Sequence, residues 1–391
     1  MSGYKLHFQN WIKNEGLVYF WESRLNVLCS CPCEGGVAKI LYKSPKQSLF
    51  PLYGKVVIYN DKIIAIPHAE SNILIYDISK DEVRFCSCGI TDEIFVQQDG
   101  GKFYEGIVRD NILYMIGFWT QYIGVFDMEN EVMKKVISIE VENREKPYKG
   151  PVMKNAVLFK DELFVTDYSF NWIYRVNLLT SKVSKRVFEL SEGGFSDIAI
   201  DKDYVWLAPR KATAFLKWNP ITDQVEYIGQ YPKEYVMSDQ ANISEICIHK
   251  NQLYSVPYRA NKVINIDIGT GEIKSCEHIN QYYGAIEKRK KEPKYQFVLS
   301  DGDYLYTYCN DLRSVIRYNP TLEQVRLIEY VIPWKTLYQD YDMKTFCEND
   351  VESFIDSIIE YSENENAQSA HAEHIGKKIF EELVKCDKSA T

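Results

Sequence analysis

The chain has 391 residues, of which 46% are hydrophobic, so its composition excludes wholesale disorder and allows one large repeat domain. The formal net charge is −9, and the one short basic run, 287–292, is bounded by acids, so we expect no nucleic-acid binding. No segment approaches the roughly 20 apolar residues of a membrane span. Residues 1–16 lack a signal-peptide pattern, which with ten scattered Cys predicts a cytoplasmic protein with reduced thiols.

The front of the chain predicts a degenerate copy of a strand repeat. Apolar runs at 17–21, 26–29 and 37–42 read as three strands, with Leu17 opening the first of them. A fourth strand is not evident. The segment before them, 4–11, is a candidate for closing a ring of repeats.

Six further copies of about 28 residues follow and align without gaps. Each copy opens its first strand with an anchor residue and closes its third strand with Asp or Asn 22 positions later. The anchor pairs are Lys55/Asp77, Glu105/Asp127, Asn155/Asn177, Asp197/Asn219, Glu245/Asp267 and Phe297/Asn319. The closing Asp or Asn precedes a tight turn, where its side chain is expected to cap backbone amides.

A repeat of roughly 40 to 50 residues with four short strands is typical of propeller blades. The sequence therefore predicts an all-β fold: a seven-bladed β-propeller of four-stranded antiparallel blades over residues 1–335. Six blades with an N-terminal closing segment is the alternative. The expected blades span about 12–46, 50–90, 100–141, 150–190, 192–232, 240–280 and 293–333.

The pattern changes after Pro333. Apolar residues recur at helical spacing over 345–362, and a second helix is expected from about 370 to 385. Residues 340–391 are thus predicted to form a C-terminal helical appendage. We expect it to contact a protein partner or a second copy of the chain.

The alignment also predicts where a site would lie, because first strands line a propeller's channel. The anchors form a ring of Leu17, Lys55, Glu105, Asn155, Asp197, Glu245 and Phe297, and the links between second and third strands open on the same face. Polar anchors beside aromatic and basic link residues predict a ligand site, with a hydrated channel rim as the alternative. The candidate ligand-binding residues are Lys55, His68, Glu105, Trp119, Asn155, Tyr168, Asp197, Arg210, Glu245, Tyr258 and Arg259.

The repeat over residues 50–333 resembles the propeller superfamily that includes the gluconolactonase/regucalcin, NHL-repeat and virginiamycin-B-lyase families. In the lactonase family, Glu, Asn and Asp side chains from different first strands hold a divalent ion. The resemblance implies Glu105, Asn155, Asp197 and Glu245 as ligands for Ca²⁺ or Mg²⁺. The segment 372–383, AEHIGKKIFEEL, resembles helices that end some bacterial surface-polysaccharide biosynthesis proteins.

These observations favour a non-catalytic propeller that binds a small polar ligand, glycan or peptide, because no nucleophile–base pair is recognisable. The alternative is a divalent-metal-dependent hydrolase or lyase, in which His68 or Asp167 moves a proton. A third possibility is an interaction platform that works through its C-terminal helices.

Overall fold

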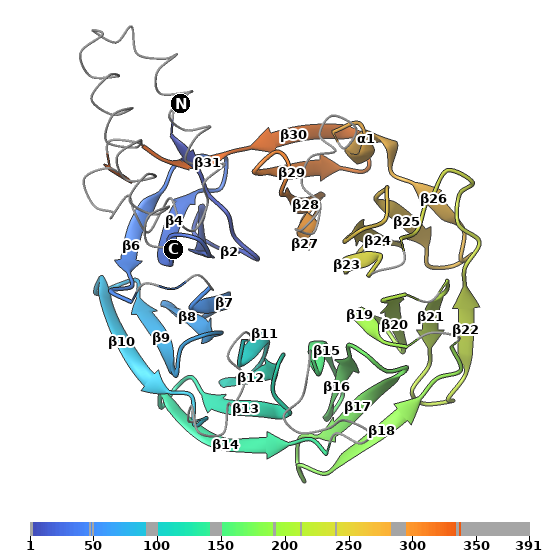
Figure 1. Cartoon of the computed structure of the whole chain (residues 1–391), viewed down its shortest axis with the longest axis horizontal. Helices are drawn as coiled ribbons and strands as arrows, with labels where there is room; N and C mark the ends of the chain where they lie inside the picture. Colours follow the sequence, from blue (N-terminus) through green and yellow to red (C-terminus); the bar gives the residue numbers. More distant parts are fainter. Residues whose placement is uncertain are drawn as a thin grey trace, which may run out of the picture.

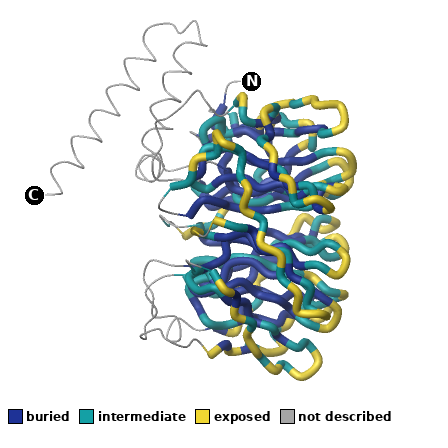
Figure 2. The backbone as a smooth tube through the Cα atoms, turned by 90° about the vertical axis from the view of Figure 1, so that its right-hand side faces the viewer, coloured by how far each residue is buried: buried dark blue, intermediate teal, exposed yellow. Residues whose placement is uncertain are grey.

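The computed structural model describes residues 3–46, 48, 51–90, 101–140, 151–190, 193–211, 213–238, 241–282, 295–333 and 336–337. Within these ranges, sheets of short antiparallel strands stand radially around a central axis (Figure 1). The predicted fold class, an all-β propeller built of four-stranded antiparallel sheets, is confirmed. Figure 2 shows the buried strands inside the disc and exposed turns along one of its faces.

Seven sheets have four strands each, joined in chain order. The first three sheets contain β2 (Ile12–Asn14), β3 (Leu17–Glu22), β4 (Val27–Pro32) and β6 (Lys39–Lys43); β7 (Tyr53–Tyr59), β8 (Lys62–Pro67), β9 (Asn72–Asp77) and β10 (Glu82–Ser87); and β11 (Phe103–Arg109), β12 (Ile112–Gly117), β13 (Tyr122–Asp127) and β14 (Val132–Ser138).

The next four sheets contain β15 (Met153–Phe159), β16 (Glu162–Asp167), β17 (Trp172–Asn177) and β18 (Val183–Val187); β19 (Phe195–Asp201), β20 (Tyr204–Pro209), β21 (Phe215–Trp218) and β22 (Val225–Ile228); β23 (Ile243–His249), β24 (Gln252–Pro257), β25 (Ile264–Asp267) and β26 (Ile273–Ser275); and β27 (Tyr295–Asp301), β28 (Tyr304–Cys309), β29 (Ser314–Asn319) and β30 (Gln324–Ile328).

An eighth sheet has three strands and joins the beginning of the chain to the end of the repeat region. In it, β1 (Tyr4–Lys5) pairs antiparallel with β31 (Tyr330–Ile332), which pairs in parallel with β5 (Gly36–Val37). The predicted count of seven blades, and the alternative of six, is therefore wrong, because the described residues form eight sheets. Repeat analysis missed the eighth sheet because its strands come from three separate, non-repeating segments.

The predicted C-terminal helical appendage is not supported. Its residues, 340–391, lie outside the described part of the chain. The named helix within that part is the short α1 (Glu277–Asn280), which follows β26. No helix among the described residues is long and apolar enough to span a membrane.

The first copy of the repeat begins earlier than the sequence indicated. Ile12 of β2 pairs with Tyr19 of β3, as Val57 of β7 pairs with Ile64 of β8. Leu17 therefore opens a second strand rather than a first. The same offset of 45 positions relates β4 to β9, so the residue equivalent to Lys55 is Asn10.

The closing Asp or Asn of each of the other six copies caps a turn, as predicted. In one copy, Asp267 Oδ1 accepts the backbone amides of Gly269 at 3.0 Å and Thr270 at 2.8 Å. The other five closing residues accept bonds from residues two and three positions further along the chain: Asp77, Asp127, Asn177, Asn219 and Asn319. These residues are structural, and their repetition fixes the geometry of the outer hairpins.

Apolar clusters hold neighbouring sheets together, and one of them closes the ring. Phe8 is fully buried, with its ring centroid 4.3 Å from that of Phe20 on β3 and 4.8 Å from that of Tyr308 on β28. The N-terminal segment thus packs the first four-stranded sheet against the last. The predicted role of residues 4–11 in closure is confirmed by this packing and by the β1–β31 pairing.

Candidate functional site

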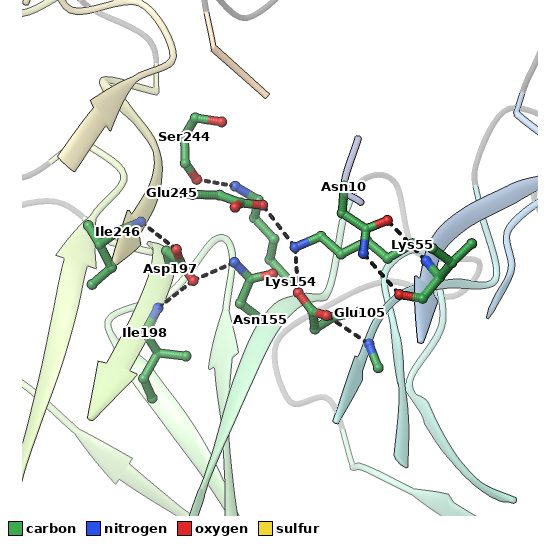
Figure 3. Close-up of polar contacts among 12 residues, drawn as sticks. Asn10, Lys55, Glu105, Lys154, Asn155, Asp197, Ile198, Ser244, Glu245 and Ile246 are labelled. Carbon is green, nitrogen blue, oxygen red and sulfur yellow. Dashed lines mark hydrogen bonds and ion pairs between the residues drawn. The ribbon is translucent and has the colours of Figure 1, made fainter. Parts of the chain in front are cut away.

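A β-bulge in six inner strands builds the lining of the channel. The pairing register shifts at the same place in β7, β11, β15, β19, β23 and β27, where each anchor residue lies. Bulges of this kind redirect side chains and are common beside functional sites. Anchor residues and the residues before them meet in one polar network at the centre of the molecule (Figure 3).

Lys55 spans the channel within this network. Its Nζ lies 2.6 Å from Glu105 Oε2 on the neighbouring β11 and 2.9 Å from Glu245 Oε1 on β23, which is four sheets away in chain order. Burial acts to lower the pKa of Lys55, but Glu105 and Glu245 outweigh it and raise that pKa well above its ordinary value. Lys55 is therefore a charged cross-brace between two carboxylates.

Asp197 is the second centre of the network. Its Oδ1 accepts the Ile198 amide at 2.7 Å and the Asn155 Nδ2, and its Oδ2 accepts the Ile246 amide at 2.6 Å. Burial and the charge of Glu245 raise the pKa of Asp197 to about 7. The four anchors Glu105, Asn155, Asp197 and Glu245 thus share one environment, as the repeat alignment predicted.

The other two predicted anchors lie elsewhere. Phe297 is buried in the apolar cluster that closes the ring, and Leu17 lies on a second strand. Asn10 occupies the equivalent place in the first copy. Its Nδ2 donates to Val56 O at 3.1 Å, and its Oδ1 accepts from Val56 N at 3.0 Å. Extending the ungapped offset of 45 positions backwards from Lys55 would have identified it.

The bulges add a second set of residues that the alignment did not single out, one position before each anchor. Among them, Lys154 Nζ donates to the Ser244 carbonyl at 2.6 Å, and the Tyr104 ring lies 5.6 Å from Lys55 Nζ. A strict alternation of strand side chains would point these residues away from the channel. The register shift, which the sequence pattern does not reveal, brings them into the network.

The links between second and third strands lie beside the entries to the first strands. His68 N donates to Leu52 O at 2.9 Å, and His68 O accepts from Lys102 N at 2.7 Å. Phe118 makes the equivalent two bonds: its N donates to Lys102 O at 3.0 Å, and its O accepts from Val152 N at 2.6 Å. The first of these bonds, from the link nitrogen to a carbonyl at the entry of the first strand of the same sheet, recurs at Tyr168, Arg210 and Tyr258. These links therefore lie beside the entries to the first strands and form a rim there, and bonds at His68, Phe118 and Arg210 join neighbouring sheets.

Aromatic side chains run along part of this rim. The Phe118 ring lies 5.1 Å from that of Tyr104 and 6.1 Å from that of Tyr168, while the Arg210 guanidinium lies 4.3 Å from the Tyr168 ring centroid. The Trp119 ring meets Phe118 edge-on at 6.0 Å. All five residues are half-buried, so they present apolar and polar surface together above the network.

The Tyr258 and Arg259 pair continues the rim. The Arg259 guanidinium lies 5.3 Å from the Tyr258 ring centroid, and both residues are half-buried. Tyr258 N donates to Asn242 O at 2.8 Å, which fixes the link to the entry of β23. The predicted link residues thus lie on the same face as the channel network.

The two candidate proton-transfer residues are held in structural contacts. His68 Nδ1 lies 3.0 Å from the Phe103 carbonyl, and burial lowers the pKa of His68 below its ordinary value. Asp167 is fully buried, and its Oδ1 accepts the amides of Ser169 at 2.8 Å and Phe170 at 2.9 Å. These contacts order the two links, and neither residue is an anchor of the network.

The arrangement of the four candidate metal ligands does not fit a divalent ion. The ammonium of Lys55 lies between Glu105 and Glu245, and the oxygens of Asp197 accept backbone amides. Among the residues placed by the structure, no group of three or more His, Cys, Asp or Glu side chains could hold a metal ion. A protein donor therefore already contacts each of the three carboxylates that a lactonase-like metal centre would need.

Comparisons with known proteins agree with the fold. A streptogramin B lyase structure has a TM-score of 0.58 at 14% identity, covering 84% of this chain and 95% of that chain. Virginiamycin B lyase from Staphylococcus aureus has a TM-score of 0.56 at 14% identity, covering 79% and 92%. The WD40 repeats of RRP9 give 0.52 at 9% identity, covering 75% and 84%.

No protein-family model matches the chain, and no curated protein matches it. At such low identity, the structural likenesses concern the fold alone. The resemblance to propellers predicted from the repeat, virginiamycin B lyase among them, is confirmed at that level. The described residues of this chain therefore have a β-propeller fold.

Proposed function

We propose that this chain is a non-catalytic, ligand-binding β-propeller. Its ligand would be a small polar molecule, a glycan or a peptide, bound where the rim of link residues meets the mouth of the channel. The observation that carries the proposal is the half-buried aromatic and cationic rim directly above a buried polar network. Aromatic walls with a few convergent polar groups are typical of such pockets.

Unsatisfied polar atoms in the lining support the same proposal. Asn155 Oδ1 and Ser196 Oγ are buried and have no hydrogen-bond partner among the described residues. Buried polar atoms are rarely left without partners, since each costs about 1–3 kcal/mol. Hydroxyl or amide groups of a bound ligand would form hydrogen bonds with these two atoms. Before the ligand binds, water molecules would take the same positions.

The structural contacts of His68 and Asp167 favour binding over catalysis. Both residues stabilise links through backbone partners, and the Tyr174 hydroxyl adds a 2.9 Å bond to the second Asp167 oxygen. A catalytic acid or base would instead have to face the reacting atoms of a substrate. In a binding protein, His68 and Asp167 would only have to hold the rim in place, which their observed contacts already do.

Substitutions on the rim test the proposal. A panel of oligosaccharides and short peptides is screened for binding by isothermal titration calorimetry, and the affinity of each binder is measured for Tyr258→Ala and Arg259→Ala. We expect both variants to bind about tenfold more weakly or worse, because they remove central aromatic and guanidinium contacts.

Matched controls lie on the outer strands. Tyr227 on β22 is exposed, and Arg326 on β30 forms a surface pair with Glu34, so Tyr227→Ala and Arg326→Ala should leave affinity unchanged. A panel without any binder contradicts the proposal. So does a binder whose affinity is the same for wild type and both rim variants.

A further inference from the structure

Two cations lie beside one aromatic ring of the rim. Lys154, on the bulge of β15, has its Nζ 6.0 Å from the Tyr168 ring centroid. Arg210, in the link after β20, has its guanidinium carbon 4.3 Å from the same centroid. Two positive charges from neighbouring sheets thus converge at Tyr168.

Lys154 is a buried cation that forms no ion pair among the described residues. Its exposed fraction is 7%, close to the 8% of Lys55, yet Lys55 has two carboxylates within 3 Å and Lys154 donates only to the neutral Ser244 carbonyl. No carboxylate of the described residues forms an ion pair with it. Burial lowers the pKa of Lys154, and Glu245 and Asp197 offset this only in part. A buried charge without a partner is costly, so such a site favours an incoming anion.

Arg210 has one buried donor without a partner beside the same ring. Its Nη1 donates to the Tyr168 carbonyl at 3.4 Å, while its buried Nε has no hydrogen-bond partner. It too has no carboxylate partner within the described ranges. The guanidinium fork matches the geometry of a carboxylate or a phosphate, and such charge-assisted bonds are stronger than neutral ones.

The nearby carboxylates do not form ion pairs with Lys154 or Arg210. Glu105 and Glu245 both form ion pairs with Lys55, and Asp197 accepts the amides of Ile198 and Ile246. These carboxylates are therefore already engaged by Lys55 or by backbone amides, while Lys154 and Arg210 lie beside Tyr168 without an ion pair among the described residues.

We propose that Lys154 and Arg210 bind an anionic group of the ligand, a carboxylate or a phosphate, beside the Tyr168 ring. This inference rests on the proposed binding function and narrows the ligand class to acidic molecules. The remainder of the ligand would contact the rim of Phe118, Tyr168 and Tyr258. A neutral glycan or a peptide without an accessible acidic group would not satisfy the two cations.

Simple anions test the inference without knowledge of the ligand. The unfolding midpoint is measured in inorganic phosphate, in acetate and in chloride at equal ionic strength and pH 7. Wild type should be stabilised more by phosphate, by acetate or by both than by chloride, and the comparison identifies the preferred anion. Titration calorimetry with the better anion should show about tenfold weaker binding, or none, for Lys154→Met and for Arg210→Met.

The control is Lys202→Met, which removes one positive charge from an exposed hairpin turn between β19 and β20. It should retain the anion effect. Arg210 is only half-buried, so its variant keeps the test valid if Lys154→Met fails to fold. Equal midpoints in phosphate, acetate and chloride overturn the inference, as does an anion effect that survives in Arg210→Met.

A matched ligand pair separates this inference from the function on which it rests. Glucose is compared with glucose 6-phosphate and with glucuronate in the same titration. Binding of the acidic sugars alone supports the inference. Binding of neutral oligosaccharides that depends on Tyr258, together with no anion effect, rejects the inference and leaves the proposed function standing.

Discussion

At the scale of single residues, burial decides which ion pairs matter. The Lys55–Glu105 and Lys13–Asp301 pairs have almost equal N–O distances, 2.6 and 2.7 Å. Their side chains differ in exposure, at 9% and 15% for the first pair and 50% and 44% for the second. Removing one partner of a buried pair leaves an uncompensated charge, whereas exposed pairs are screened by water.

We therefore predict that Lys55→Met lowers the free energy of unfolding by about 3–5 kcal/mol, because it leaves Glu105 and Glu245 facing each other. Lys13→Met, the matched control, should cost less than about 1 kcal/mol. Urea unfolding of the two variants measures both values. Similar losses for the two would show that Lys55 is not the cross-brace of the channel.

The pH dependence of stability depends on Asp197 in a defined direction. Its pKa in the folded state is about 7, above the value of about 4 expected in the unfolded chain, because of burial and Glu245. Between these values the folded state binds more protons than the unfolded state. The free energy of unfolding therefore falls as pH rises from about 4 to 7, by at most about 1.4 kcal/mol per pH unit from this group.

The variant Asp197→Asn should remove this slope, so its stability relative to wild type should rise between pH 5 and 7. Urea unfolding at several pH values measures the difference. Asp267→Asn is the control, since hydrogen bonds to Thr270 and Gly269 hold the pKa of Asp267 below its ordinary value and outside this window. A constant difference between wild type and Asp197→Asn across the window would refute the assignment.

At the scale of elements, the outer hairpins, which join third to fourth strands, share one backbone position with the same conformation. The residue four positions after each closing Asp or Asn has a positive φ, and in the turn between β25 and β26 it is Gly271, at +75°. A Cβ there would meet only Ile228 at 3.6 Å or more, which is ordinary contact. The cost of a side chain is therefore conformational.

Gly271→Ala should lower the free energy of unfolding by about 1–2 kcal/mol, the penalty for a side chain in the left-handed region. Gly269→Ala, in the same turn but without a positive φ, is the matched control and should have little effect. Thermal unfolding of the two variants compares them. A Gly269→Ala loss equal to that of Gly271→Ala would show that φ is not the cause.

The repeated elements were the part of the fold most accessible from sequence. Anchors such as Asp197 and closing residues such as Asn219 recur at fixed spacing because each copy uses the same bulge and the same turn. Asn10 was missed because β2 is short, so its copy lacks a clear apolar run. Lys154 was missed because a bulge overrides simple alternation, and Asp167 looks the same in sequence whether it caps a link or transfers a proton.

At the scale of the whole molecule, the ring depends on contacts between its two ends. A stack of sheets can leave unpaired strand edges exposed, and closure removes them. Here β1 pairs with β31, while the side chain of Phe8 fills the space between β3 and β28. The eighth sheet and the aromatic cluster beside it thus turn seven repeated units into a closed body, which keeps Lys55 and Glu245 within reach of each other.

This dependence predicts that Phe8→Ala loosens the molecule locally. The cavity should cost about 3–5 kcal/mol, as for other buried Phe. Hydrogen exchange followed by mass spectrometry should speed up first in β3 and β28, the two strands that Phe8 contacts. Phe164→Ala, equally buried but 5.2 Å from Trp218 within the ring, should instead affect β16 and β21. If Phe8→Ala speeds exchange equally in every sheet, the ring unfolds as a single unit and its closure is not a separate step.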